Sequence, residues 1–213
     1  MDLAGLKAAY QRRRYEVFFW SLLATLAALA LRVPDAVGRA LFSTSVLVTL
    51  EAGPTRRVMV ALVVAAWLVM LVAPGASVDL AGMSFLALLG VVITVLILRY
   101  ALRAKVVGRE HIFAGLSGYL LLGLICGQLY WLIEQHAPGS LAVPADTGTF
   151  SLPDGVYFSL ATLTTVGYGD ITPRTELARG LATIEAVTGQ IYLAVFVARL
   201  IGLYVSRKSA GPS

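Results

Sequence analysis

The sequence is poor in charged residues and contains a single cysteine, and both scarcities restrict the kind of protein it encodes. Charged residues make up 14% of its 213 residues, whereas soluble domains carry about 25%. The lone cysteine, Cys126, excludes a disulfide within the chain. The sequence also lacks phosphate-binding loops, clusters of metal ligands and groupings of catalytic nucleophiles. This composition predicts a membrane protein, and an enzyme is not expected.

Long apolar runs fill most of the chain, and their lengths predict membrane helices. They cover residues 16–31, 36–50, 58–73, 79–98, 108–135 and 176–206. A crossing needs about 20 residues, so the short, hydroxyl-bearing second run suggests a helix packed against neighbours. For the first run a signal peptide is the alternative, because Ala28-Leu29-Ala30 resembles a cleavage site. We keep this run as the first span.

Basic residues between the runs predict the orientation of the chain. The net charge of +5 does not indicate nucleic acid, because these residues lie where they orient helices against a membrane. With six spans, the groups that fall on one side are residues 7–14, 56–57, 99–109 and 207–208. The positive-inside rule puts that side, and hence both termini, in the cytoplasm. Arg109 and His111 are candidates for contact with anionic lipid there, although topological anchoring explains them equally well.

A glycine-rich heptad before the last run offers a row of backbone oxygens. Residues 164–170 read Thr-Thr-Val-Gly-Tyr-Gly-Asp. Gly167 and Gly169 permit positive φ, which lets consecutive carbonyls line up on one side. Such a row can replace the hydration shell of a potassium ion. A soluble turn containing Gly-Tyr-Gly is the alternative, since short glycine motifs are weak alone.

The flanks of the heptad favour a membrane pore over a soluble turn. Ser151 can cap a helix that has Pro153 in its first turn and Asp154 at the capping-box position. This helix, running to about Thr164, is too short to cross the membrane. The preceding loop, residues 135–150, is rich in Pro, Gly, Ala and Thr and is interpreted as a turret around an outer mouth.

The order of span, turret, half-helix, Thr-Val-Gly-Tyr-Gly-Asp and second span resembles the pore module of tetrameric potassium channels. The first four runs resemble the peripheral domain of the six-transmembrane-helix, voltage-gated-like superfamily, in its bacterial type, by helix count and orientation only. The resemblance implies an all-α membrane protein with four peripheral transmembrane helices and a two-helix pore module with a re-entrant half-helix and selectivity filter. It implies a cytoplasmic leader (1–15), a peripheral domain (16–107), a pore domain (108–206) and a cytoplasmic tail (207–213). One heptad per chain implies a homotetramer, with three identical subunits as partners.

Within this resemblance, the filter comprises Thr165, Val166, Gly167, Tyr168 and Gly169, with Thr164 and Asp170 as supports. The resemblance implies that the K⁺-binding carbonyls are those of Thr165, Val166, Gly167 and Tyr168. Tyr168 favours potassium, because related non-selective channels carry an aspartate at this position. Asp170 resembles the family's outer-mouth acid. Bacterial relatives often pair that acid with a glutamate in the half-helix, but this chain has Ala161 at the matching position.

The last helix carries an acid and a glycine of interest. Glu185 lies about 15 Å along it, and an acid at such depth is a functional hypothesis by default. We interpret Glu185 as a support hydrogen-bonded to Thr162, Thr164 or a filter amide, with a direct ion site as the alternative. Gly189 resembles the family's inner-helix hinge, with a packing contact as the alternative. An apolar stripe that could gate by dewetting, or simply face lipid, consists of Leu193, Val197, Ile201 and Val205.

Two usual controls are not found in the sequence. A voltage sensor needs several arginines spaced through the membrane, but residues 79–98 contain none. Arg99 and Arg103, at the cytoplasmic end, are interpreted as snorkelling to lipid headgroups. Few residues follow Ser206, so a nucleotide- or calcium-binding domain is not expected there.

The expected function is therefore passive, potassium-selective conduction by a homotetramer in the bacterial inner membrane, surrounded by membrane lipids. Two alternatives remain, a non-conducting or regulatory channel-like subunit and a potassium transporter subunit. No organic cofactor is expected, only K⁺ ions in the filter.

Overall fold

The computed structural model describes residues 13–31, 76–103, 108–144 and 148–209, which are mostly helical. The helices are α2 (Arg14–Ala30), α5 (Ala76–Arg103), α6 (Arg109–His136), α7 (Leu152–Leu163) and α8 (Glu176–Ser209). Two short strands, β1 (Leu141–Ala142) and β2 (Thr172–Pro173), pair antiparallel. The runs expected at 36–50 and 58–73 lie outside the described residues.

Three helices in the described part of the chain are long and apolar enough to cross a membrane. Their membrane-compatible stretches are Ala81–Ala101 in α5, Arg109–His136 in α6 and Glu176–Arg199 in α8. The 17 residues of α2 fall just short of this length. The prediction of an all-helical membrane protein is therefore confirmed, whereas the six spans remain a prediction.

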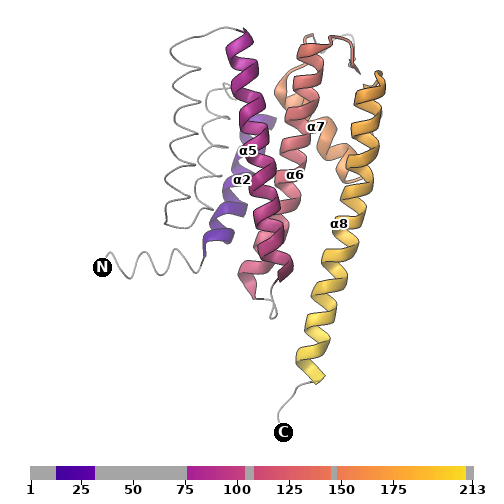
Figure 1. Ribbon diagram of the computed structural model, residues 1–213. Helices are drawn as coiled ribbons and strands as arrows, with labels where there is room; N and C mark the ends of the chain where they lie inside the picture. Colours follow the sequence, from indigo (N-terminus) through magenta and orange to yellow (C-terminus); the bar gives the residue numbers. More distant parts are fainter. Residues whose placement is uncertain (1–12, 32–75, 104–107, 145–147, 210–213) are drawn as a thin grey trace, which may run out of the picture.

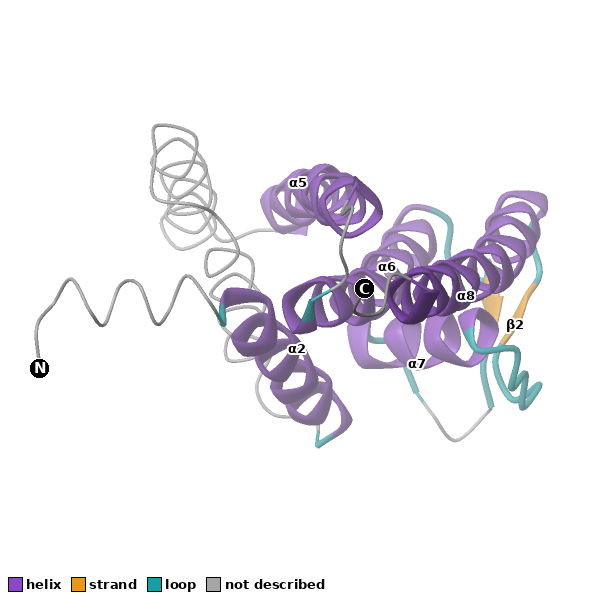
Figure 2. Ribbon diagram, turned by 90° about the horizontal axis from the view of Figure 1, so that it is seen from below, coloured by secondary structure: helices purple, strands orange, loops and turns teal. Residues whose placement is uncertain are grey.

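Helix α6 occupies the centre of the arrangement and contacts α2, α5, α7 and α8. Figure 1 shows α2, α5 and α6 side by side, with the short α7 between α6 and the long α8. Seen along the helices in Figure 2, α2 and α5 lie on one side of α6, and α8 lies on the other. The main core forms where α2, α5 and α6 meet; its most buried members include Phe18, Leu22, Ile93, Ile97 and Leu121.

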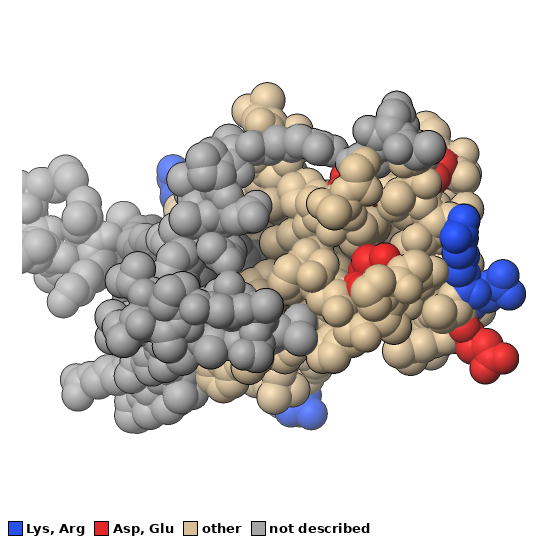
Figure 3. All heavy atoms as spheres, turned by 90° about the horizontal axis from the view of Figure 1, so that it is seen from above, with Lys and Arg blue, Asp and Glu red and all other residues tan. Residues whose placement is uncertain are grey.

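The start of α2, the end of α5 and the start of α6 meet at one end of the molecule. Arg109 and Glu16 form an ion pair at 2.7 Å. The ring of Tyr100 stacks on Tyr15 and on His111, with centroid distances of 4.6 and 4.8 Å. Arg14 also lies over the rings of Tyr15 and Tyr100, so two of the basic residues predicted to share one side of the membrane, Arg14 and Arg109, lie together at this end. At the opposite end most of the described surface is neither basic nor acidic, with acidic side chains near its centre and basic and acidic side chains next to each other at one edge (Figure 3).

Candidate ion-conducting site

Glycines allow the half-helix α7 to lie directly against α6. A Cβ on Gly127 would sit 2.5 Å from the Cα of Val156, and a Cβ on Gly123 would sit 2.6 Å from a methyl of Leu160. Gly155 of α7 faces the Gly127 carbonyl at similarly close range. A backbone atom cannot turn aside as a side chain can, so Gly127 admits no larger residue here. The small residues on the two helices therefore permit a close contact between α6 and α7.

Helix α7 begins at the predicted capping box. The Ser151 N–H donates to Asp154 Oδ2 at 2.9 Å, and the Asp154 N–H bonds to the Ser151 side chain. With 12 residues, α7 is about 18 Å long and cannot span. At its other end the Tyr119 hydroxyl of α6 donates to the Leu163 carbonyl at 3.0 Å. The C-terminal end of α7 adjoins the heptad. Because a helix C-terminus carries a partial negative charge, this end favours a cation.

The heptad leaves α7 through a left-handed turn. Thr165 N–H donates to the Thr162 carbonyl at 3.0 Å and Val166 N–H to the Ala161 carbonyl at 2.9 Å. These are the two bonds of a Schellman motif, with Thr165 (φ 60°) where glycine is usual. Positive φ at Gly167 (56°) and Gly169 (80°) was predicted and is confirmed. The left-handed Thr165 was not predicted.

Four consecutive carbonyls of the heptad have no hydrogen-bond donor within the described part of the chain. They belong to Thr165, Val166, Gly167 and Tyr168. Consecutive unpaired backbone carbonyls of this kind can coordinate a cation. Val166 and Tyr168 are 52% and 71% exposed, so the single chain leaves these side chains largely uncovered.

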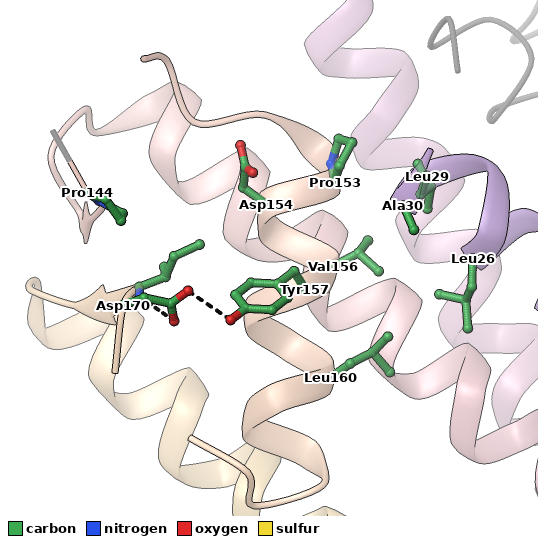
Figure 4. A pocket seen from close by; sticks show the side chains of 11 residues that line it. Leu26, Leu29, Ala30, Pro144, Pro153, Asp154, Val156, Tyr157, Leu160 and Asp170 are labelled. Carbon is green, nitrogen blue, oxygen red and sulfur yellow. Dashed lines mark hydrogen bonds between the residues drawn. The ribbon is translucent and has the colours of Figure 1, made fainter. Parts of the chain in front are cut away.

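At the end of the heptad, Asp170 is hydrogen-bonded to Tyr157 of α7. The Tyr157 hydroxyl donates to Asp170 Oδ2 at 2.8 Å (Figure 4), and the Ile171 N–H donates to Oδ1 at 3.0 Å. The hydrogen bond from Tyr157 lowers the pKa of Asp170, and the same bond raises the pKa of Tyr157. The glutamate missing at Ala161 thus has a replacement one turn earlier on α7. We did not identify Tyr157 from the sequence.

Glu185 is buried between three helices, at 2% exposure. Its Oε2 lies 2.7 Å from the hydroxyl of Tyr130 on α6, and its Oε1 bonds to the hydroxyl of Ser159 on α7. The expected hydrogen bond to the half-helix is present, but Ser159 provides it rather than the expected partners, Thr162, Thr164 or a filter amide. Glu185 meets α7 at Ser159, one turn before those threonines. This burial gives no support to the alternative of a direct ion site.

Gly189 packs against the end of the half-helix. A Cβ there would lie 2.5 Å from the Leu163 carbonyl oxygen, so the close approach alone requires glycine. The hinge remains a prediction. Of the apolar stripe, Leu193, Val197 and Ile201 are 38%, 49% and 58% exposed, as are residues on other faces of α8. The side chain of Val205 lies outside the described residues, and the gating role of the stripe stays a prediction.

Residues that the sequence analysis missed are the hydroxyl donors of this site: Tyr119, Tyr130, Tyr157 and Ser159. Each belongs to a helix whose existence was predicted, but its partner lies 13 to 55 positions away in the chain. The available signal was the presence of hydroxyl side chains in two largely apolar segments, where such groups need partners.

Residues 114–206 match the family model described as ion channel. The chain is 33% identical over 95 residues to two pore potassium channel b of Oryza sativa subsp. japonica, covering 45% of this chain and 24% of that protein. It is 37% identical over 93 residues to the inward rectifier potassium channel Kirbac3.1 of Paramagnetospirillum magnetotacticum, covering 44% and 26%. A third relative is the human voltage-gated potassium channel regulatory subunit KCNF1, 33% identical over 88 residues, covering 41% and 16%.

The chain therefore spans about a quarter or less of these relatives. No solved structure matches it. Three observations concern the same part of the chain. The helices are long enough to cross a membrane, a short helix adjoins a row of unpaired carbonyls, and the sequence is similar to potassium channels. Together they indicate a membrane protein whose residues 114–206 are similar to ion channels.

Proposed function

We propose that this chain is the subunit of a homotetrameric, potassium-selective channel that conducts K⁺ passively. The observation that carries the proposal is the run of four carbonyls, Thr165 to Tyr168, that have no hydrogen-bond donor among the described residues. One strand offers one oxygen at each level, whereas stripping water from K⁺ requires a ring of oxygens. Four copies around one axis complete each ring and cover the exposed side chains of Val166 and Tyr168.

The finer features of the proposal rest on the sequence. The peripheral part contributes four helices, both termini are cytoplasmic and the membrane is the bacterial inner membrane, because the basic groups then lie on the inside. Basic residues of α5 are confined to its end, at Arg99 and Arg103. Conduction therefore lacks a steep, arginine-based dependence on voltage.

A non-conducting, regulatory subunit is the second candidate, because one relative is named a regulatory subunit. A regulatory subunit would assemble with conducting subunits and carry no current alone. Flux from the purified chain by itself separates this candidate from the proposed function.

The test is K⁺ flux into liposomes containing the purified chain. We expect barium-sensitive K⁺ flux and no Na⁺ flux, and Tyr168→Asp should admit Na⁺. Gly167→Ala should abolish flux, because a side chain at positive φ costs about 1–2 kcal/mol in each subunit. Gly139→Ala is the matched control, since Gly139 also has positive φ (87°) with nothing near its Cβ but lies in the turret. Absence of flux from folded tetramers would contradict the proposed function and favour the regulatory one.

A further inference from the structure

Three oxygen–oxygen contacts around Glu185 form a continuous chain that joins α6, α7 and α8. Tyr130 Oη lies 2.7 Å from Glu185 Oε2. Glu185 Oε1 is in hydrogen-bond contact with Ser159 Oγ. Ser159 Oγ is also 2.7 Å from the carbonyl oxygen of Gly123. Glu185, Tyr130 and Ser159 are all buried, so water does not supply these bonds.

Each of these contacts needs one hydrogen, and the hydroxyl groups supply too few. Tyr130 and Ser159 carry one hydroxyl hydrogen each, and a carbonyl oxygen carries none. If Glu185 were ionised, two hydrogens would serve three contacts. One pair of oxygens would then face each other without a hydrogen: Ser159 with Gly123, or Ser159 with the carboxylate. The Gly123 carbonyl keeps its helical partner within α6, but two buried oxygens within hydrogen-bond distance and with no hydrogen between them repel each other.

The structure assigns the missing hydrogen to Glu185: the residue is held as a neutral carboxylic acid that donates from Oε1 to Ser159. Ser159 in turn donates to the Gly123 carbonyl, and Tyr130 donates to Glu185 Oε2. This arrangement gives every contact one hydrogen. A proton on Oε2 would not do so, because Ser159 would still serve two acceptors with one hydrogen.

The surroundings of Glu185 agree with a neutral acid. In the described part of the chain no lysine or arginine forms an ion pair with it. The titratable groups that face it are Tyr130, Cys126 and, further away, Tyr119, all on α6. From α7 it meets only the hydroxyl of Ser159. A buried carboxylate with no cation nearby is strongly unfavourable.

The proton of Glu185 therefore allows α7 to be hydrogen-bonded to α6 and to α8 at the same time. When the proton dissociates at alkaline pH, Ser159 can satisfy only one of its two acceptors. The attachment of α7 to α6 or to α8 is then lost. The protonation state follows from the geometry alone, whereas an effect on conduction rests on the proposed function.

Infrared difference spectroscopy of the purified protein tests the assignment directly. At neutral pH we expect the carbonyl band of a protonated carboxylic acid in the unchanged chain and its loss in Glu185→Gln. Ser159→Ala should shift this band, because the acid loses its acceptor. Absence of any band that depends on Glu185 at neutral pH would overturn the inference, whether or not the protein conducts.

Thermal unfolding gives an independent test. Glutamine reproduces the neutral acid, since its amide donates to Ser159 and its carbonyl oxygen accepts from Tyr130. Glu185→Gln should therefore keep the melting temperature at neutral pH and lose the alkaline decrease that the unchanged chain shows. Leucine can neither donate to Ser159 nor accept from Tyr130, so Glu185→Leu should lower the melting temperature at both neutral and alkaline pH. An equal alkaline decrease in Glu185→Gln would overturn the inference and assign the effect to Tyr130 or Cys126.

Discussion

The hydroxyl of Tyr157 donates to the carboxylate of Asp170 across 2.8 Å, and this bond joins the two sides of the filter segment. Tyr157 lies on α7, before the filter, and Asp170 follows directly after it. The Tyr157 ring also stacks on Tyr168, with centroids 6.1 Å apart and planes 6° apart. One side chain thus holds both the outer filter residue and the acid next to it.

Replacing Tyr157 by phenylalanine should preserve the ring stack and remove the bond to Asp170. We expect K⁺ flux that starts normally and then declines faster, because the outer end of the filter loses a restraint. Flux recorded over time in liposomes measures this effect. Tyr100→Phe is the matched control, since its ring stacks likewise and no described group hydrogen-bonds its hydroxyl. An equal change in both variants would refute the role given to Tyr157.

External acid should break the same bond at a pH below the ordinary range of a carboxyl group. The pKa of Asp170 is lowered chiefly by Tyr157. The stabilisation is therefore fully present above the ordinary pKa and is lost as pH falls through the lowered one. The raised pKa of Tyr157 keeps its proton in place beyond the usual tyrosine range.

The acid midpoint of flux, measured against external pH, tests this sign. In Tyr157→Phe the midpoint should move upward, towards the ordinary carboxyl value. A midpoint that stays in place, or moves downward, would show that another group titrates.

The elements around the filter were predictable because their signals are local. Ser151, Pro153 and Asp154 sit at fixed positions of one helix start, and Gly167 and Gly169 have a conformational meaning of their own. The pairing of Tyr157 with Asp170 has no such local signal. It depends on the filter folding back along α7, which only the three-dimensional structure shows.

Adding a methyl group at Gly189 should destabilise the protein. The Cβ would lie 2.5 Å from the Leu163 carbonyl, and overpacking of this kind costs about 1–3 kcal/mol. Thermal unfolding of Gly189→Ala in detergent measures the loss. Gly180→Ala, on the same helix with nothing within 4 Å of its Cβ, should be neutral or slightly stabilising. Unchanged stability of Gly189→Ala with reduced flux would favour the hinge over the packing contact.

Removing the hydroxyl of Tyr119 should weaken the end of α7. The bond to the Leu163 carbonyl is 3.0 Å long, and a typical hydrogen bond contributes about 0.5–1.5 kcal/mol. We expect Tyr119→Phe to lower the free energy of unfolding by that amount in each subunit. Calorimetry against Tyr100→Phe measures it, and an identical loss in the control would show that the bond contributes nothing.

Glu185 marks the limit of what its sequence position could tell. Its depth in the helix correctly predicted a hydrogen bond to the half-helix. The observed partner, Ser159, lies one turn before the expected threonines, because the crossing of α7 over α8 decides which residue of α7 faces Glu185. The crossing depends in turn on how deeply Gly123, Gly127 and Gly155 let α7 sink against α6.

The two-residue ribbon of β1 and β2 pins together the two ends of the segment that holds the half-helix and the filter. Leu141 pairs with Pro173 and Ala142 with Thr172, and the Arg174 N–H donates to the Ser140 carbonyl at 2.8 Å. The two ends of this segment thus lie next to each other, as in a domain inserted into another protein. Residues 141–173 form a natural cassette, so chimaeras joined at the ribbon should exchange filters between channels while the spanning helices stay intact.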